Sequence, residues 1–158
     1  MSPNAYSTDC NEFISLLNRH NVRWVIVGGE AVIYYGYVRL TGDVDFFYST
    51  DKVNIDNLHS ALREFWSYNI PGNIQKKDLE EEGNFIQFGV PPNRIDLMNK
   101  IDGVRFEEVW NNRLTEEIET DQGNITVYYI GLNELIKNKR KSNRPKDLED
   151  LKFLESRL

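Results

Sequence analysis

The stretch Val27-Gly28-Gly29-Glu30-Ala31-Val32, followed after a short gap by Arg39-Leu40-Thr41-Gly42-Asp43-Val44-Asp45-Phe46, joins a glycine turn to two aspartates. The apolar run 22–27 predicts a strand that ends at the glycine pair, and residues 31–35 can begin a helix. A glycine turn that opens a helix lets phosphate oxygens approach backbone N–H groups at the positive end of the helix dipole. We therefore expect Gly28 and Gly29 to bind phosphate, although any strand-to-helix turn favours glycine.

Asp43 and Asp45 lie two residues apart in a run that favours β-structure. Because side chains alternate along a strand, both carboxylates point to the same side. Phe46 follows directly, so Asp45 lies inside the strand rather than at its end, where turn-forming acids are common. Two like charges this close together favour a bound cation, and a glycine turn beside them is typical of a nucleoside triphosphate site with its metals.

Asp96 is a third acidic candidate, because it stands alone among apolar residues in the stretch 93–98. Residues 84–90 predict a hairpin partner for this strand across the turn 91–93. Three carboxylates within about 4–6 Å raise one another's pKa unless a divalent cation offsets their charge. Hard oxygen ligands select Mg²⁺ or Mn²⁺. We therefore expect Asp43, Asp45 and Asp96 to be both metal ligands and catalytic residues.

The composition is that of a folded globular domain. The chain has 158 residues, of which 40% are hydrophobic and 12% aromatic, and no Gly/Ser-rich or Pro-rich tract divides it. A chain of this length buries about two-thirds of its unfolded surface. It shows neither a long apolar span nor a basic-then-apolar leader, so we expect a cytoplasmic protein without membrane contact. One cysteine and two histidines leave too few soft ligands for a structural zinc.

Basic residues are concentrated near the C-terminus. The net charge of −6 argues against a general nucleic-acid coat protein, yet residues 137–146 contain no acid. The cations there are Lys137, Lys139, Arg140, Lys141, Arg144 and Lys146. A nucleic-acid-binding module at this segment is one interpretation, but the acidic total and the lack of interleaved aromatic residues disfavour it.

The combination of motifs resembles the DNA polymerase β-like nucleotidyltransferase superfamily, whose pattern is a glycine turn on a helix, then Asp-x-Asp, then a third carboxylate on a later strand. The chain also looks like a small bacterial subgroup that is similar to the AbiEii-type toxin nucleotidyltransferases. The stretches that carry this narrower resemblance are Arg39-x-Thr41-x-Asp43-Val44-Asp45, Ile101-Asp102-Gly103-Val104, Gly131-Leu132, Asn138-Lys139-Arg140 and Arg144-Pro145-Lys146-Asp147-Leu148. The resemblance covers most of the chain, from about Trp24 to the C-terminus.

Alternating helix and strand patterns predict an α/β (α+β) fold, with a mixed β-sheet and helices packed on it. The resemblance implies a minimal nucleotidyltransferase fold in a single domain, 1–158, with a core at about 9–130 and a C-terminal helical segment at 131–158. We expect a first helix at 9–20, capped by Thr8 or Asp9, and a third helix capped by Asn54. We also expect a mobile loop at 67–83 beside the site and a last strand at 124–130 before two C-terminal helices.

Lys139 continues the inward stripe formed by Leu132, Leu135 and Ile136 on a predicted helix. It could equally be a lysine whose stem covers apolar surface while its charge reaches solvent. The resemblance implies a lysine near the triphosphate, which favours a role in nucleotide binding. Asp147 is a secondary candidate only, because acids at a helix start are expected from the dipole alone.

Arg39 and Thr41 precede the strand that carries Asp43. A guanidinium at this position could bind a phosphate in bidentate fashion, although a surface ion pair is the competing interpretation. We assign both residues to nucleotide binding.

The function implied is transfer of a nucleoside monophosphate from an NTP to an acceptor hydroxyl. Asp43 and Asp45 would hold one metal on the triphosphate, and Asp45 with Asp96 a second. Asp96 would also accept the proton of the acceptor. The acceptor could be tRNA, another protein or a small molecule. The alternative is a non-catalytic NTP-binding or antitoxin-like subunit that works with a cognate partner protein.

Overall fold

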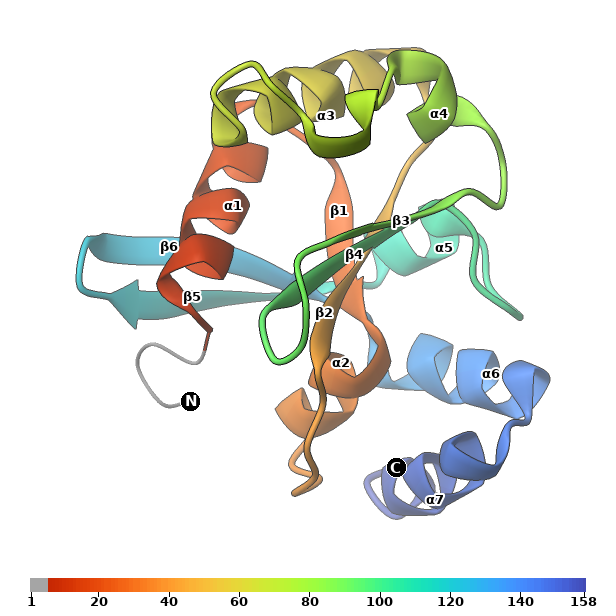
Figure 1. The fold of residues 1–158 in the computed structure, drawn as a ribbon. Coiled ribbons are helices and arrows are strands. Elements are labelled where there is room, and N and C mark those ends of the chain that lie inside the picture. Colours follow the sequence, from red (N-terminus) through yellow and green to blue (C-terminus); the bar gives the residue numbers. More distant parts are fainter. Residues whose placement is uncertain (1–5) are drawn as a thin grey trace.

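A six-stranded mixed sheet forms the centre of the protein (Figure 1). The structure is a computed structural model that describes residues 6–158. The strands are β1 (Trp24–Val27), β2 (Asp43–Tyr48), β3 (Phe85–Phe88), β4 (Arg94–Met98), β5 (Leu114–Thr120) and β6 (Gly123–Tyr129), in the spatial order β3-β4-β2-β1-β6-β5. β1 is antiparallel to β2 and parallel to β6, while β2 is parallel to β4. The predicted mixed sheet is confirmed.

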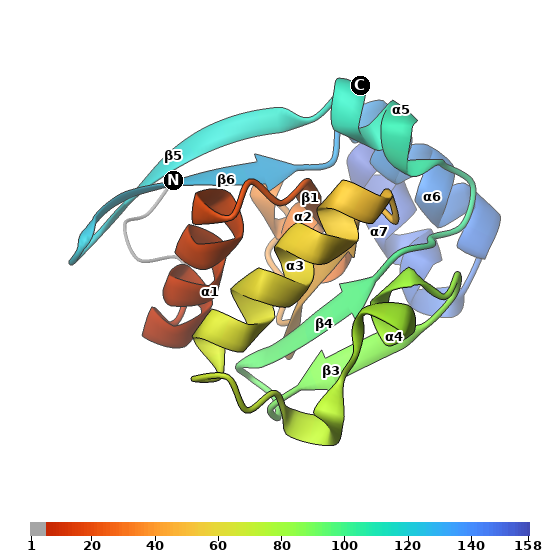
Figure 2. The same cartoon turned by 90° about the horizontal axis from the view of Figure 1, so that it is seen from above.

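Helices pack on both faces of this sheet. They are α1 (Thr8–Arg19), α2 (Gly28–Tyr34), α3 (Lys52–Phe65), α4 (Lys76–Glu80), α5 (Phe106–Asn111), α6 (Leu132–Ser142) and α7 (Pro145–Glu155), with a 3₁₀ turn η1 (Pro71–Asn73). Seen from above, α1 and α3 lie over one face of the sheet (Figure 2). α2, α6 and α7 lie together near the end of β1 where α2 begins (Figure 1).

β1 connects two hydrophobic clusters, because all four of its residues are buried. Trp24 and Ile26 belong to the cluster with α1 and α3, whereas Val25 and Val27 belong to the cluster with α2, α6 and α7. A strand covered on both faces has a continuous apolar run rather than an alternating one. The end of β1 is therefore held from both sides at the point where the glycine turn begins.

Two predicted helix caps are wrong. α1 begins at Thr8, and its cap is Ser7, whose hydroxyl accepts a hydrogen bond from the backbone N–H of Cys10. α3 begins at Lys52 after Asp51. Asn54 is buried inside the first turn of α3, where its side chain accepts from the N–H of Arg23 and donates to two backbone carbonyls. Asn54 thus joins two segments of the chain instead of capping a helix.

The segment 67–83, predicted to be a mobile loop beside the site, contains η1 and α4 and lies away from the site. Leu79 in α4 is fully buried, and its carbonyl accepts hydrogen bonds from the Tyr48 hydroxyl at 2.8 Å and from the Asn99 amide at 3.1 Å. Tyr48 ends β2, whereas Asp43 begins it, so the segment lies at the opposite end of that strand from the predicted site. Leu79, with the partly buried Ile70 and Ile74, packs this segment against the core without a periodic sequence pattern.

β5 is a strand that the sequence analysis missed. It pairs antiparallel with β6 along its whole length at the edge of the sheet. Ile118 is its one buried residue within a run of threonines and glutamates. Charged edge strands of this kind limit pairing with other chains and give little hydrophobic signal. Across residues 6–158 the structure contains no helix that is both long enough and apolar enough to cross a membrane.

Candidate functional site

Three aspartates converge at the parallel pairing of β2 and β4. Asp45 lies directly opposite Asp96 in the register of the two strands, and Asp43 is two residues away on β2. Each of the three offers a carboxylate oxygen, and these oxygens all lie within 4.8 Å of one another. Asp96 is only 1% exposed. We call Asp43, Asp45 and Asp96 the acid triad, since the structure brings together the three acids that the sequence analysis selected.

Arg94 neutralises part of this charge. Its guanidinium donates to Asp43 Oδ2 at 2.7 Å and to the two carboxylate oxygens of Asp96 at 2.9 and 3.1 Å. The sequence analysis missed Arg94. Its signal was the spacing of two from Asp96, which places both side chains on the same face of β4. The Arg94 guanidinium therefore donates hydrogen bonds to Asp43 and Asp96 but not to Asp45.

Asp45 is the member of the acid triad that lacks a hydrogen-bond partner for a buried oxygen. Within the described part of the chain, nothing donates to its Oδ1. Burial, followed by the charges of Asp43 and Asp96, raises the pKa of Asp45 to about 7. A buried polar atom without a partner is costly, and a divalent cation is the partner that such a carboxylate accepts best. The residues present thus fit a bound Mg²⁺ or Mn²⁺.

The pKa of Asp43 is shifted in the opposite direction from that of Asp45. Burial tends to raise its pKa, but hydrogen bonds, among them those from Thr41 and Arg94, bring the pKa of Asp43 below its usual value. The Thr41 hydroxyl donates to Asp43 Oδ1 at 3.0 Å. Thr41 therefore orients a carboxylate of the acid triad, which is a different contact from the phosphate contact assigned to it from the sequence.

The glycine pair is shaped around the acid triad and the loop before it. Gly28 has a φ of +67°, and a Cβ built on it would lie 2.1 Å from Asp45 Oδ2. A Cβ on Gly29 would lie 2.9 Å from both an Arg39 nitrogen and the Thr41 hydroxyl. Larger residues at either position would collide with these groups. The first turn of α2 is thus in direct contact with Asp45.

Lys139 lies on the inward face of α6, where the sequence placed it, and is 3% exposed. Its ammonium lies 3.0 Å from Asp147 Oδ1 and 3.1 Å from Asp150 Oδ2. We call Asp147 and Asp150, both on α7, the helix acids. Arg39 lies 3.3 Å from Asp150, so its ion pair is with a buried acid rather than with one at the surface.

Both helix acids form ion pairs with cations, although Asp150 Oδ2 receives no hydrogen bond from the described residues. Arg144 donates to Asp147 Oδ2 at 2.8 Å, and Ser142 donates to the same oxygen. Burial opposes the charged form, but the bonds from Arg144, Ser142 and Lys139 hold the pKa of Asp147 well below its usual range. Asp147 is thus a structural partner of Lys139 in this structure.

A cavity of about 250 Å³ adjoins the acid triad. Its lining includes Gly28, Asp45, Asp102, Lys139 and Arg144. An anion beside a metal ion at Asp45 would therefore meet backbone N–H groups and two cationic side chains. This is the part of the structure where the predicted nucleotide-binding residues Gly28 and Lys139 come together.

Two of the four remaining basic residues in the segment 137–146 form ion pairs. Lys137 lies 2.6 Å from Glu108, and Arg140 lies 2.7 Å from Glu155. These pairs neutralise charge that a nucleic acid would otherwise attract. Lys141 and Lys146 are exposed and have no ion pair within residues 6–158.

Comparison with known proteins identifies the class. Residues 8–155 match the family described as nucleotidyltransferase of unknown function (DUF6036), and the chain belongs to this family. The fold is similar to the crystal structure of an antigenic nucleotidyltransferase-like protein from Paracoccidioides brasiliensis, with a TM-score of 0.50 and 14% identity over 96% of this chain and 77% of that chain. At this identity the likeness concerns the fold alone. No curated protein matches the sequence significantly.

Proposed function

We propose that this protein transfers a nucleoside monophosphate from an NTP to an acceptor hydroxyl. The observation that carries the proposal is Asp45, a buried carboxylate with an unpartnered oxygen that sits between two further acids and the first turn of α2. Asp43, Asp45 and Asp96 would hold Mg²⁺ or Mn²⁺, which would supply Lewis-acid stabilisation of the phosphate charge. No other set of described residues combines a metal-binding cluster with a glycine turn.

The cavity beside Asp45 suits the triphosphate. Backbone N–H groups after Gly28 would bind phosphate oxygens, and Lys139 with Arg144 would face the charge that builds up on the departing pyrophosphate. Lys139 would do so while its ammonium remains shared with the helix acids. Its role in nucleotide binding therefore stays a prediction.

The proposed chemical step forms one bond and breaks one bond. The acceptor oxygen forms a bond to the α-phosphorus, the bond from that phosphorus to the pyrophosphate oxygen breaks, and pyrophosphate leaves with its electron pair. Asp96 would take the acceptor proton, with Arg94 holding its carboxylate in place. Most of the rate enhancement would come from positioning and charge stabilisation.

Binding is the first test. We expect Mg²⁺ or Mn²⁺ with an NTP to raise the unfolding free energy of the wild-type protein by about 2.7 kcal/mol at a ligand concentration of ~100 times its dissociation constant. Asp45→Asn should lose this gain while it folds at least as well as wild type without metal, because it removes like-charge repulsion. Asp56→Asn, at an exposed ion pair with Lys76, is the matched control. Full ligand stabilisation of Asp45→Asn would contradict the assignment.

Transfer is the second test. Incubation with α-labelled NTPs and cell extract should place label on one class of molecule, and nuclease, protease and size fractionation then separate tRNA, protein and small-molecule acceptors. Binding of NTP without any label transfer would instead favour a non-catalytic NTP-binding or antitoxin-like subunit. The toxin-like role and a cognate partner protein are part of the same proposal, on the strength of the sequence motifs. Copurification of a second protein that blocks labelling would support them.

A further inference from the structure

A larger cavity, of about 540 Å³, lies between α2, the β5–β6 hairpin and the residues before α1. We call it the tyrosine pocket, because its wall includes Tyr6, Tyr34, Tyr35 and Tyr129. Its volume is in the range typical of small-molecule sites. None of the acid triad or the helix acids lines it. The proposed transfer reaction therefore leaves this cavity without a role.

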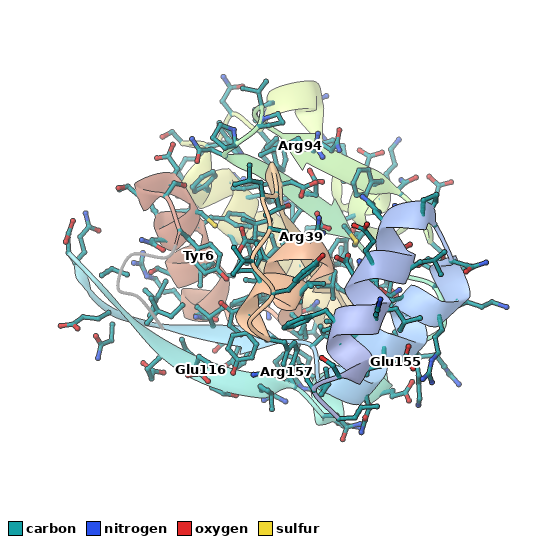
Figure 3. The ribbon with its side chains drawn as sticks, turned by 90° about the horizontal axis from the view of Figure 1, so that it is seen from below. Tyr6, Arg39, Arg94, Glu116, Glu155 and Arg157 are labelled. Carbon is teal, nitrogen blue, oxygen red and sulfur yellow. The ribbon has the colours of Figure 1, made fainter. Side chains whose placement is uncertain are left out.

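Residues from distant parts of the chain form the tyrosine pocket. In the view from below, Tyr6, Glu116 and Arg157 come from three distant parts of the chain and border the same region (Figure 3). Arg39 lies between this group and Arg94 (Figure 3). Glu30, in the first turn of α2, lines the pocket two residues after the glycine that contacts Asp45.

The aromatic wall is fixed by its own packing. The ring of Tyr34 stacks on Tyr129 with a centroid distance of 4.0 Å and an interplanar angle of 9°, and Tyr35 meets Tyr34 edge to face. The hydroxyls of Tyr6 and Tyr129 bond to each other. Pre-ordered aromatic rings offer negative π faces, which attract cations.

The polar groups of the tyrosine pocket are mainly acceptors. The Tyr34 hydroxyl donates to Glu116 at 2.6 Å, and the Tyr35 hydroxyl donates to the carbonyl of Ile130 at 2.7 Å. These two donors are thus used within the protein and are not available to an anion. The pocket presents carboxylate oxygens and π faces, which suit a ligand that donates hydrogen bonds.

The charged residues that line the tyrosine pocket also favour a cationic ligand. Among residues 6–158 nothing gives the half-buried carboxylate of Glu30 a hydrogen bond or an ion pair. The carboxylate of Glu116 accepts a hydrogen bond from the Tyr34 hydroxyl. The one cation in the lining is Arg157, which is exposed at the edge. Burial, followed by the charge of Asp43, raises the pKa of Glu30 to about 7, so a cation beside Glu30 would stabilise its charged form. Attraction between charges is stronger in a partly enclosed pocket than in bulk water, so the two acidic side chains favour a cation over an anion.

We propose that the tyrosine pocket binds an organic cation, a small molecule with alkylammonium groups, which contacts the tyrosine rings and uses Glu30 and Glu116 as its counter-charges. This site goes beyond the proposed transfer reaction and does not depend on it.

Calorimetric titration with spermidine tests the proposal in metal-free buffer that contains 150 mM NaCl. We expect saturable binding to the wild-type protein, and at least tenfold weaker binding to Glu30→Gln and to Glu116→Gln. In Glu116→Gln the amide oxygen can still accept from Tyr34, so the fold should be retained. Triacetylspermidine, which has the same skeleton without the charges, should not bind measurably.

Two matched variants decide where the cation binds. Glu117→Gln makes the same charge change on the opposite face of β5 and should bind spermidine as wild type does. Equal losses in Glu116→Gln and Glu117→Gln would mean diffuse attraction and would overturn the proposal. Loss of binding in Asp45→Asn, with Glu30→Gln unaffected, would place the cation at the acid triad instead. Binding of triacetylspermidine as tight as that of spermidine would also overturn the proposal.

Discussion

The acid triad and the helix acids are two groups of largely buried aspartates with opposite electrostatics. The acid triad shares one guanidinium, that of Arg94, and leaves an oxygen of Asp45 without a partner. The helix acids are matched by Lys139, Arg39 and Arg144. The pKa of Asp45 is accordingly raised to about 7, whereas that of Asp147 is held low. An aspartate whose charge is met inside the protein has a structural role, and one whose charge is left unmet is available for a ligand.

The largest effect on stability should follow from replacing Lys139, the cation that the two helix acids share. We expect Lys139→Met to lower the unfolding free energy by about 3–5 kcal/mol, because it leaves two buried carboxylates without their shared ammonium. Urea unfolding measures this change in the unfolding free energy. Lys137→Met, two residues earlier at an exposed pair with Glu108, should change the unfolding free energy little, because solvent screens exposed ion pairs. If both variants lose the same amount of stability, the helix acids do not depend on Lys139. The contrast between the helix acids and the acid triad would then be wrong.

A smaller but more selective effect is expected at Gly28. Gly28→Ala should cost about 2–4 kcal/mol, since a positive φ disfavours alanine and the new methyl group collides with Asp45. It should also abolish Mn²⁺ binding, because Asp45 must move away. Gly83→Ala is the control, with a φ of +89° and open space around its Cβ. It should lose about 1 kcal/mol and keep Mn²⁺ binding, and a loss of metal in both would point to a general loss of order.

The smallest expected effect concerns pH. Asp45 has a folded-state pKa of about 7, above its unfolded value of about 3.9, so the folded protein binds the proton more tightly. Without metal, the unfolding free energy should therefore fall as the pH rises from about 4 to about 7, by on the order of 1–2 kcal/mol. Asp45→Asn should reduce this slope and leave the part that comes from Glu30, whose pKa burial also raises to about 7. A steeper slope in the variant would show that another group controls the titration.

The acid triad could be predicted from the sequence because it depends on local patterns. The spacing of two on β2 and the apolar surroundings of Asp96 are both visible in a single segment. The role of Arg94 was hidden, because it depends on how β2 and β4 pair. The stripe on α6 predicted that Lys139 points inward, but not that Asp150 on the next helix would meet it. Short segments with one buried anchor, such as Leu79 in α4 and Ile118 in β5, carry no periodicity from which to predict them.

The contact between Gly28 and Asp45 also constrains how this family can change over evolutionary time. Alanine at position 28 is sterically excluded as long as the carboxylate occupies the space of its Cβ. Once Asp45 is replaced by a smaller residue, only the backbone cost of about 1 kcal/mol remains. Loss of the acid should therefore precede loss of the glycine in any lineage that abandons the activity. A homologue with glycine but no aspartate would be a recently inactivated copy, whereas the reverse combination should be rare.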